Sequence, residues 1–108
     1  MSDKLPSFAA FWPFYLSQHA NPRTRALHYC GTALGSLMLV CFLFTNDWAI
    51  FAGALVAGYG PAWAAHAFIE RNRPATFTYP IWSLCADYRM LFFAATGRLA
   101  GELARAAR

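Results

Sequence analysis

The chain carries three histidines, His19, His28 and His66, and their spacing around one turn predicts that they meet. His28 lies 19 residues before Asp47, and His66 lies 19 residues after it. If both intervening segments are helical, each histidine lies about 28 Å from that turn, so the two imidazoles lie at one level. His19 comes just ahead of a helix start at Asn21 and belongs to the same end. We therefore expect all three side chains to converge.

Glu70 adds a carboxylate to this group, because it follows His66 at i+4 and shares its helix face. Imidazole and carboxylate suit Fe(II), Zn or Mn, and no cysteine pair has the spacing of a structural zinc site. Open positions on such an iron would permit oxygen chemistry. A solvated ion pair with neighbouring arginines is the plainer alternative for Glu70. Asp87 either pairs with Arg89 or Arg25 or binds the metal in place of Glu70.

The composition indicates that these residues lie in a membrane protein. Of 108 residues, 58% are hydrophobic and 13% are charged, whereas a soluble domain has about 25% charged residues. The length allows a single domain over residues 1–108, which cannot bury so much apolar surface by itself. A disordered tail, a disulfide-stapled secreted module and a typical soluble enzyme are excluded. The three cysteines lie in apolar stretches and are expected to be small buried hydrophobes: Cys30, Cys41 and Cys85.

The pattern predicts an all-α membrane bundle built around a central transmembrane hairpin. Two almost uncharged stretches, 26–44 and 48–69, approach or meet the roughly 20 residues needed to cross a bilayer, and 45–47 form the turn. The aromatic stretch 8–16 is too short to span and predicts an N-terminal interfacial helix. A last helix begins near Pro80 and runs through 81–95 towards the C-terminus, and we expect it to be a re-entrant or membrane helix.

The positions of the cations predict how the hairpin is oriented in the membrane. Its turn carries no cation, whereas its outer ends carry Lys4, Arg23, Arg25, Arg71 and Arg73. The positive-inside rule places these ends, and the histidines, at the cytoplasmic face. We expect this membrane to be a bacterial inner membrane, or the endoplasmic reticulum in a eukaryote. Small residues at helical spacing from the histidines predict that they face the helix contact rather than lipid: Gly31, Gly35, Gly58 and Ala62. The net charge of +4 is scattered and lacks the basic stripe that nucleic-acid binding requires.

Three segments resemble the signatures of one family of small membrane proteins. They are His19-Ala-Asn-Pro-Arg-Thr-Arg-Ala-Leu-His28 with the following Gly-Thr, the segment 60–77 around His66 and Glu70, and the segment 80–90. The family was long catalogued as a membrane domain of unknown function, and its fungal member is a 2-hydroxy fatty acid dioxygenase. The resemblance covers residues 8–99.

The resemblance implies an Fe(II)-dependent α-oxidation. A 2-hydroxy fatty acid would react with O2, lose its carboxyl carbon as CO2 and leave a fatty acid one carbon shorter. The family's histidines are thought to hold the iron, and they map onto His19, His28 and His66. Glu70 or a water would then be the fourth ligand. Thr24 stands where the first signature leads us to expect Asn.

A 2-hydroxy carboxylate could chelate iron while its tail stays among the acyl chains of membrane lipid. Arg25 or Arg73 could hold the remaining carboxylate oxygen, a task suited to the planar guanidinium. No catalytic residue is expected beyond the metal ligands, and a homo-oligomer is left open. Two alternatives remain: a b-type haem electron carrier with two axial histidines, and a non-catalytic membrane scaffold whose histidines satisfy hydrogen bonds.

Overall fold

The computed structural model describes residues 4–107, and every regular element in that range is helical. The α-helices are α1 (Phe8–Ser17), α2 (Pro22–Thr45), α3 (Trp48–Ala65), α4 (Pro80–Ala95) and α5 (Leu99–Ala106). A π-helix, η1 (His66–Glu70), continues α3, and a 3-10 helix, η2 (Ala75–Phe77), precedes α4. The all-α prediction is therefore confirmed for these residues.

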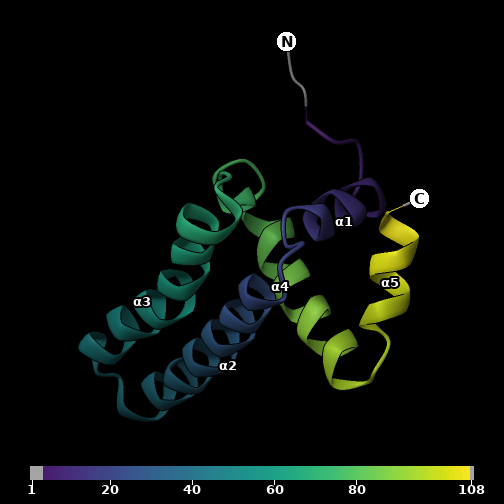
Figure 1. The fold of residues 1–108 in the computed structure, drawn as a ribbon. Coiled ribbons are helices and arrows are strands. Elements are labelled where there is room, and N and C mark those ends of the chain that lie inside the picture. Colours follow the sequence, from purple (N-terminus) through teal and green to yellow (C-terminus); the bar gives the residue numbers. More distant parts are fainter. Residues whose placement is uncertain (1–3, 108) are drawn as a thin grey trace.

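α2 and α3 form an antiparallel hairpin that projects away from the other helices (Figure 1). Asn21 caps α2, since its side chain accepts the backbone N–H two residues later, and Pro22 occupies the first helical position. At the far end Asn46 adopts the left-handed conformation with a φ of 54° and ends α2. Asp47 then caps α3 with its carboxylate. The predicted helix start and turn are both confirmed.

The hairpin helices touch where glycines face each other. A Cβ built on Gly31 would lie 2.7 Å from the carbonyl oxygen of Gly58, and one built on Gly35 would lie 3.0 Å from the Gly58 Cα. Real side chains do not tolerate the first of these distances. The absence of a Cβ therefore lets the two backbones approach, as small residues do between membrane helices.

Both arms of the hairpin are long and apolar enough to cross a membrane. The candidate segments are Pro22–Thr45 and Trp48–Glu70, and only 11% and 17% of their apolar windows are buried within the protein. Large apolar side chains near the turn are exposed: Phe44 is 85% exposed and Trp48 is 69% exposed. These helices are therefore not the buried core of the part of the chain that the structure describes.

The cysteines also lie on this open surface. Cys30, Cys41 and Cys85 are all exposed, so the expectation that they are buried hydrophobes was wrong. Lying in an apolar stretch did not imply burial, because the helices of this small protein turn much of their apolar surface outwards.

The core lies beside the hairpin, where α1 packs on α4. α1 buries four large side chains there: Phe11, Trp12, Tyr15 and Leu16. α4 contributes Ala86 and Met90, neither of which has exposed surface. The aromatic stretch expected to form an interfacial helix is a helix, and its largest side chains pack on protein.

α5 is a separate helix that the sequence pattern did not predict. α4 ends at Ala95, and Gly97 turns the chain with a φ of 75°. α5 then packs against α1, where Trp12 Nε1 donates a 2.9 Å hydrogen bond to Glu102. This bond and the nearby Arg105 hold the pKa of Glu102 below its ordinary value.

Replacing Gly31 with alanine should loosen the hairpin. Because the new Cβ would meet the Gly58 carbonyl oxygen, we expect the free energy of unfolding to fall by about 1–3 kcal/mol. Thermal unfolding in detergent measures this as a lower Tm. Gly60→Ala is the matched control, because nothing lies within 4 Å of its Cβ. Equal melting of the two variants would contradict a role for the glycine contact.

Candidate metal centre

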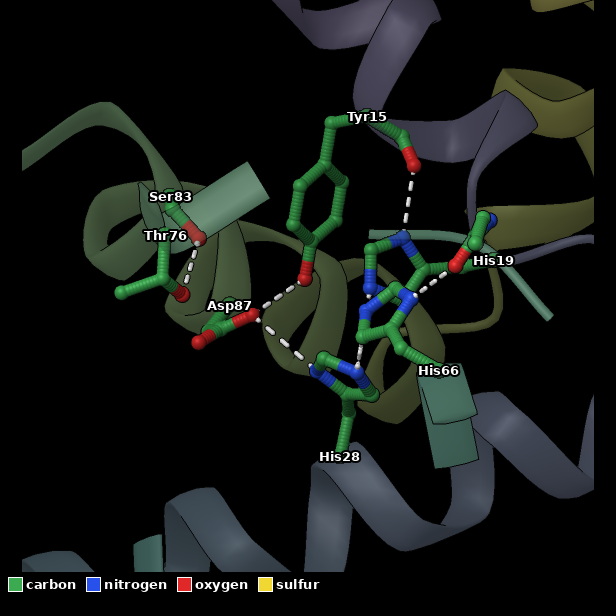
Figure 2. Close-up of polar contacts among 8 residues, drawn as sticks. Tyr15, His19, His28, His66, Thr76, Ser83 and Asp87 are labelled. Atoms are coloured by element: carbon green, nitrogen blue, oxygen red, sulfur yellow. Dashed lines mark hydrogen bonds and ion pairs between the residues drawn. The ribbon is translucent and has the colours of Figure 1, made fainter. Parts of the chain in front are cut away.

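The three histidines converge where α1, α2 and the end of α3 meet (Figure 2). His19, His28 and His66 are all buried, with 5% exposure or less. Nε2 of His28 lies 3.1 Å from Nε2 of His19 and 3.2 Å from Nε2 of His66. The prediction that the two hairpin histidines lie level, and that His19 joins them, is confirmed.

The other nitrogen of each imidazole faces an oxygen of the protein. The pairs are His19 Nδ1 with the Tyr15 carbonyl at 2.6 Å, His28 Nδ1 with Asp87 Oδ1 at 3.3 Å, and His66 Nδ1 with Asn72 Oδ1 at 2.6 Å. A carbonyl, a carboxylate and an amide oxygen can only accept, so Nδ1 carries the proton in each imidazole. Every Nε2 lone pair is thereby left to point into the centre.

This donor set fits a divalent cation. The Nε2 atom of His28 lies 3.1 and 3.2 Å from the other two Nε2 atoms, and with no proton between them their lone pairs repel. A cation placed among these nitrogens removes that repulsion. Two nitrogens bound to one ion at about 2.1 Å lie about 3.0–3.4 Å apart at angles of about 90–110°. Histidines that bind metals in other proteins also donate a hydrogen bond to an oxygen from the N–H of the ring nitrogen that does not bind the metal. The cluster could therefore hold a metal ion.

The π-helix η1 brings Asn72 to His66. Arg71 follows it in the left-handed conformation with a φ of 56°, and the backbone N–H groups of Arg71 and Asn72 both donate to the His66 carbonyl. The chain thus folds back over His66, and Asn72 reaches its Nδ1. The amide nitrogen of Asn72 donates to the Gln18 carbonyl at 3.3 Å, so its oxygen faces the imidazole. We expected an α-helix through residue 69; a π turn replaces its last turn, a feature frequent at functional sites.

His19 is held by the end of α1. The Tyr15 ring, one turn earlier, stacks on the imidazole with centroids 4.1 Å apart. Nη1 of Arg25 donates to the backbone carbonyls of His19 at 2.8 Å and Ala20 at 3.0 Å, which fixes the link to α2. Burial, helped by His28, lowers the pKa of His19 to about 2. The side chain is therefore neutral, as a metal ligand must be.

Asp87 joins α4 to the site. Its Oδ1 accepts hydrogen bonds from the Tyr15 hydroxyl and from His28 Nδ1. Burial, followed by the neighbouring carboxylate, raises the pKa of Tyr15 well above its ordinary value, so the hydroxyl keeps its proton and donates. The expected pairing with Arg89 or Arg25 is not what the structure gives, since Arg89 instead stacks over the Trp12 ring.

The other predicted site residues lie outside the group of converging nitrogens. Glu70 Oε2 accepts the backbone N–H of Asn21 at 2.8 Å and so ties the end of η1 to the start of α2. Arg73 is exposed, with its guanidinium 5.3 Å from the Phe77 ring centre. Arg25 contacts the His19 backbone. Metal ligation by Glu70 and carboxylate binding by the two arginines stay predictions.

Sequence reasoning missed Tyr15, Asn72 and the true partner of Asp87. Tyr15 carried a usable signal, because it precedes His19 by one helical turn. Asn72 carried none, since a spacing of six residues from His66 matches no regular helix face. Within the described residues, the buried hydroxyl of Thr24 has no hydrogen-bond partner. It lies one turn before His28, where the resemblance led us to expect Asn.

Comparison with known families places the chain in one family. A family profile described as 2-hydroxy-palmitic acid dioxygenase Mpo1-like matches residues 5–99. The chain belongs to the Mpo1-like family. The match covers the three histidines and Asp87, and the resemblance read from the sequence is thereby confirmed. No match was found for this Mpo1-like chain among curated proteins or among solved structures.

Asp87→Asn should weaken metal binding in the Mpo1-like chain. A neutral amide makes His28 a weaker and less firmly oriented ligand, and loss of such outer partners costs about 10–100-fold in affinity. Competition between the protein and a chromophoric chelator for Co(II) measures this change. Glu102→Gln is the control, because Glu102 bonds to Trp12 on the outer side of α1. Unchanged Co(II) affinity in Asp87→Asn would contradict the assigned contact.

Metal-free protein should lose stability as the pH falls below about 6.5. His19 stays neutral in the folded state because its pKa is about 2, whereas an unfolded histidine takes up a proton near pH 6.5. Between these values the unfolded state binds more protons, so unfolding becomes easier by up to about 1.4 kcal/mol per pH unit. Tm measured in detergent between about pH 7 and 5 reports the loss, and His19→Gln should show a flatter dependence. A wild-type Tm that is constant over this range would show that His19 is not buried and neutral.

Proposed function

We propose that this chain is a membrane-embedded, Fe(II)-dependent dioxygenase that shortens 2-hydroxy fatty acids by one carbon. The observation that carries the proposal is that three buried imidazoles converge through their Nε2 atoms, while each Nδ1–H donates a hydrogen bond to an oxygen. The family description names the dioxygenase reaction on 2-hydroxy-palmitic acid. Oxygen chemistry selects iron over zinc, because zinc has no redox states to offer O2.

In this proposal His19, His28 and His66 hold the metal through Nε2. Fe(II) held there would supply the redox chemistry that O2 activation requires and would bind the hydroxyl and carboxylate oxygens of the substrate. Atom balance requires one O2 for each 2-hydroxy acid and gives one shortened acid, one CO2 and one water. The α-carbon is oxidised to the new carboxyl carbon and the old carboxyl carbon is oxidised to CO2, and O2 accepts the electrons from both.

The surrounding residues keep the three imidazoles in place. Asp87 accepts a hydrogen bond from His28 Nδ1 and so raises the basicity of that ligand, and the Tyr15 hydroxyl donates to the same carboxylate oxygen. Arg25 bonds to the His19 carbonyl, beside the centre, and we assign it to the substrate carboxylate, with Arg73 as the outer alternative. Glu70 would have to leave the Asn21 N–H to become a fourth ligand.

The hairpin suits an amphiphilic substrate. We propose that Pro22–Thr45 and Trp48–Glu70 span the membrane, with the histidines at the end that carries the flanking arginines. The positive-inside rule makes this the cytoplasmic side. A 2-hydroxy acid in the same leaflet would then present its polar head at the level of the histidines and its tail among the acyl chains.

A haem carrier fits these donors less well. Axial imidazoles lie on opposite faces of a porphyrin, about 4 Å apart at bond lengths of about 2 Å. The nitrogens of His28 and His66 are 3.2 Å apart, and His19 lies against the same nitrogen of His28. This spacing favours a single metal ion bound by three imidazoles over a haem bound between two imidazoles.

The reaction can be tested directly. Purified protein loaded anaerobically with Fe(II) should consume O2 when 2-hydroxypalmitate is added, and mass spectrometry should find the fatty acid one carbon shorter. His28→Ala should abolish the uptake because it removes one of three ligands, while Glu102→Gln should retain it. Uptake that ignores the substrate, or a product with the original carbon number, would refute the proposed function. Protein that retains no transition metal would point to the scaffold alternative.

A further inference from the structure

A groove with a cavity volume of about 190 Å³ runs along the hairpin beside α4. The lining nearest the histidines includes Thr32, Gly58 and Asp87, and the lining furthest from them includes Leu39, Ala54 and Leu55. From Gly31 to Leu39 the groove follows eight residues of α2, which is about 12 Å. Its far end is therefore apolar, while its polar lining extends from Asp87 and Thr32 to Ser36, whose hydroxyl bonds to that of Tyr88.

The groove borders the metal centre at Asp87, and the three histidines themselves are not among its lining residues. Asp87 lines it and also bonds to Nδ1 of His28 at 3.3 Å. Thr32 follows His28 at i+4 and lies directly beyond it on the same face of α2. The polar end of the groove thus begins one helical turn from a proposed metal ligand.

The groove is also open along its apolar walls. Leu39, Leu55 and Leu84 are 41%, 48% and 44% exposed, and all three lie on helices that turn apolar surface outwards. A long alkyl chain can therefore enter from the side, out of the lipid, without threading through a closed pore.

We propose that this groove binds the alkyl chain of the 2-hydroxy acid and that Leu39 and Leu55 limit the length of chain it accepts. The inference rests on the proposed function, because it assumes that the head of the substrate lies at the histidines. A chain with a polar chelating head and an apolar tail matches both ends of the groove. The Asp87 oxygen at the polar end is already engaged by Tyr15 and His28, so that oxygen is not free to bond to the substrate.

Photolabelling tests the position of the chain without turnover. The probe is 2-hydroxypalmitate that carries a diazirine at its terminal carbon, added to wild-type protein in nanodiscs without O2. We expect adducts on Leu39 or Leu55 that excess 2-hydroxypalmitate suppresses. A phosphatidylcholine with a diazirine on its tail should instead label outer positions such as Leu43 and Val56. Adducts of the acid probe on those outer positions, or equal labelling of the groove by the phospholipid, would overturn the proposal.

A bulky side chain at the far end gives a second test. Leu55→Trp should weaken binding of 2-hydroxypalmitate at least about tenfold and leave 2-hydroxyoctanoate nearly unchanged, since each methylene displaced from apolar contact costs about fourfold. Val56→Trp is the matched control, because Val56 is a neighbour that is 72% exposed and does not line the groove. Unchanged Co(II) affinity shows that both variants are folded.

The two proposals can fail separately. Groove labelling in a protein that shows no O2 uptake would refute the reaction and retain the chain-binding groove. An active enzyme whose Leu55→Trp variant binds both acids as the wild type does would refute the groove and retain the reaction.

Discussion

The repulsion among three buried imidazole lone pairs is the constraint on which the rest of this structure depends. Each Nδ1 proton is committed to an oxygen, so each Nε2 must face the others or a cation. Water cannot relieve the repulsion freely, because His19 and His66 are only 1% and 2% exposed. A divalent ion bound among the three nitrogens would replace this repulsion with attraction. The surrounding helices can be understood as the means of holding three nitrogens at one point.

Helix α1, helix α4 and the π turn that follows α3 contribute to that task. α1 supplies the Tyr15 carbonyl and ring, α4 supplies Asp87, and the π turn after α3 supplies Asn72. The aromatic core between α1 and α4 fixes these groups relative to one another. The hairpin has little core of its own, and its glycine contact sets the spacing between His28 and His66. A small core beside an apolar hairpin is a workable arrangement when lipid covers the remaining apolar surface.

Much of the site could be predicted because helix rise is constant. Equal distances of His28 and His66 from Asp47 placed them at one level, and the Asn21-Pro22 start placed His19 beside them. What could not be predicted depended on non-periodic backbone or on packing between distant segments. The π turn that delivers Asn72 has no sequence period, and Asp87 meets Tyr15 and His28 only through tertiary packing. The exposed cysteines were missed because an apolar stretch does not say which of its faces turns outwards.

Binding of one metal ion by the Nε2 atoms of three histidines can be measured. X-ray absorption at the iron edge, on protein loaded anaerobically with Fe(II), tests it most directly because imidazole rings give a distinct outer-shell scattering pattern. We expect a fit with about three imidazoles at metal–nitrogen distances of about 2.1 Å, and one fewer in His28→Ala. A spectrum fitted by oxygen ligands alone, or one that His28→Ala leaves unchanged, would contradict it.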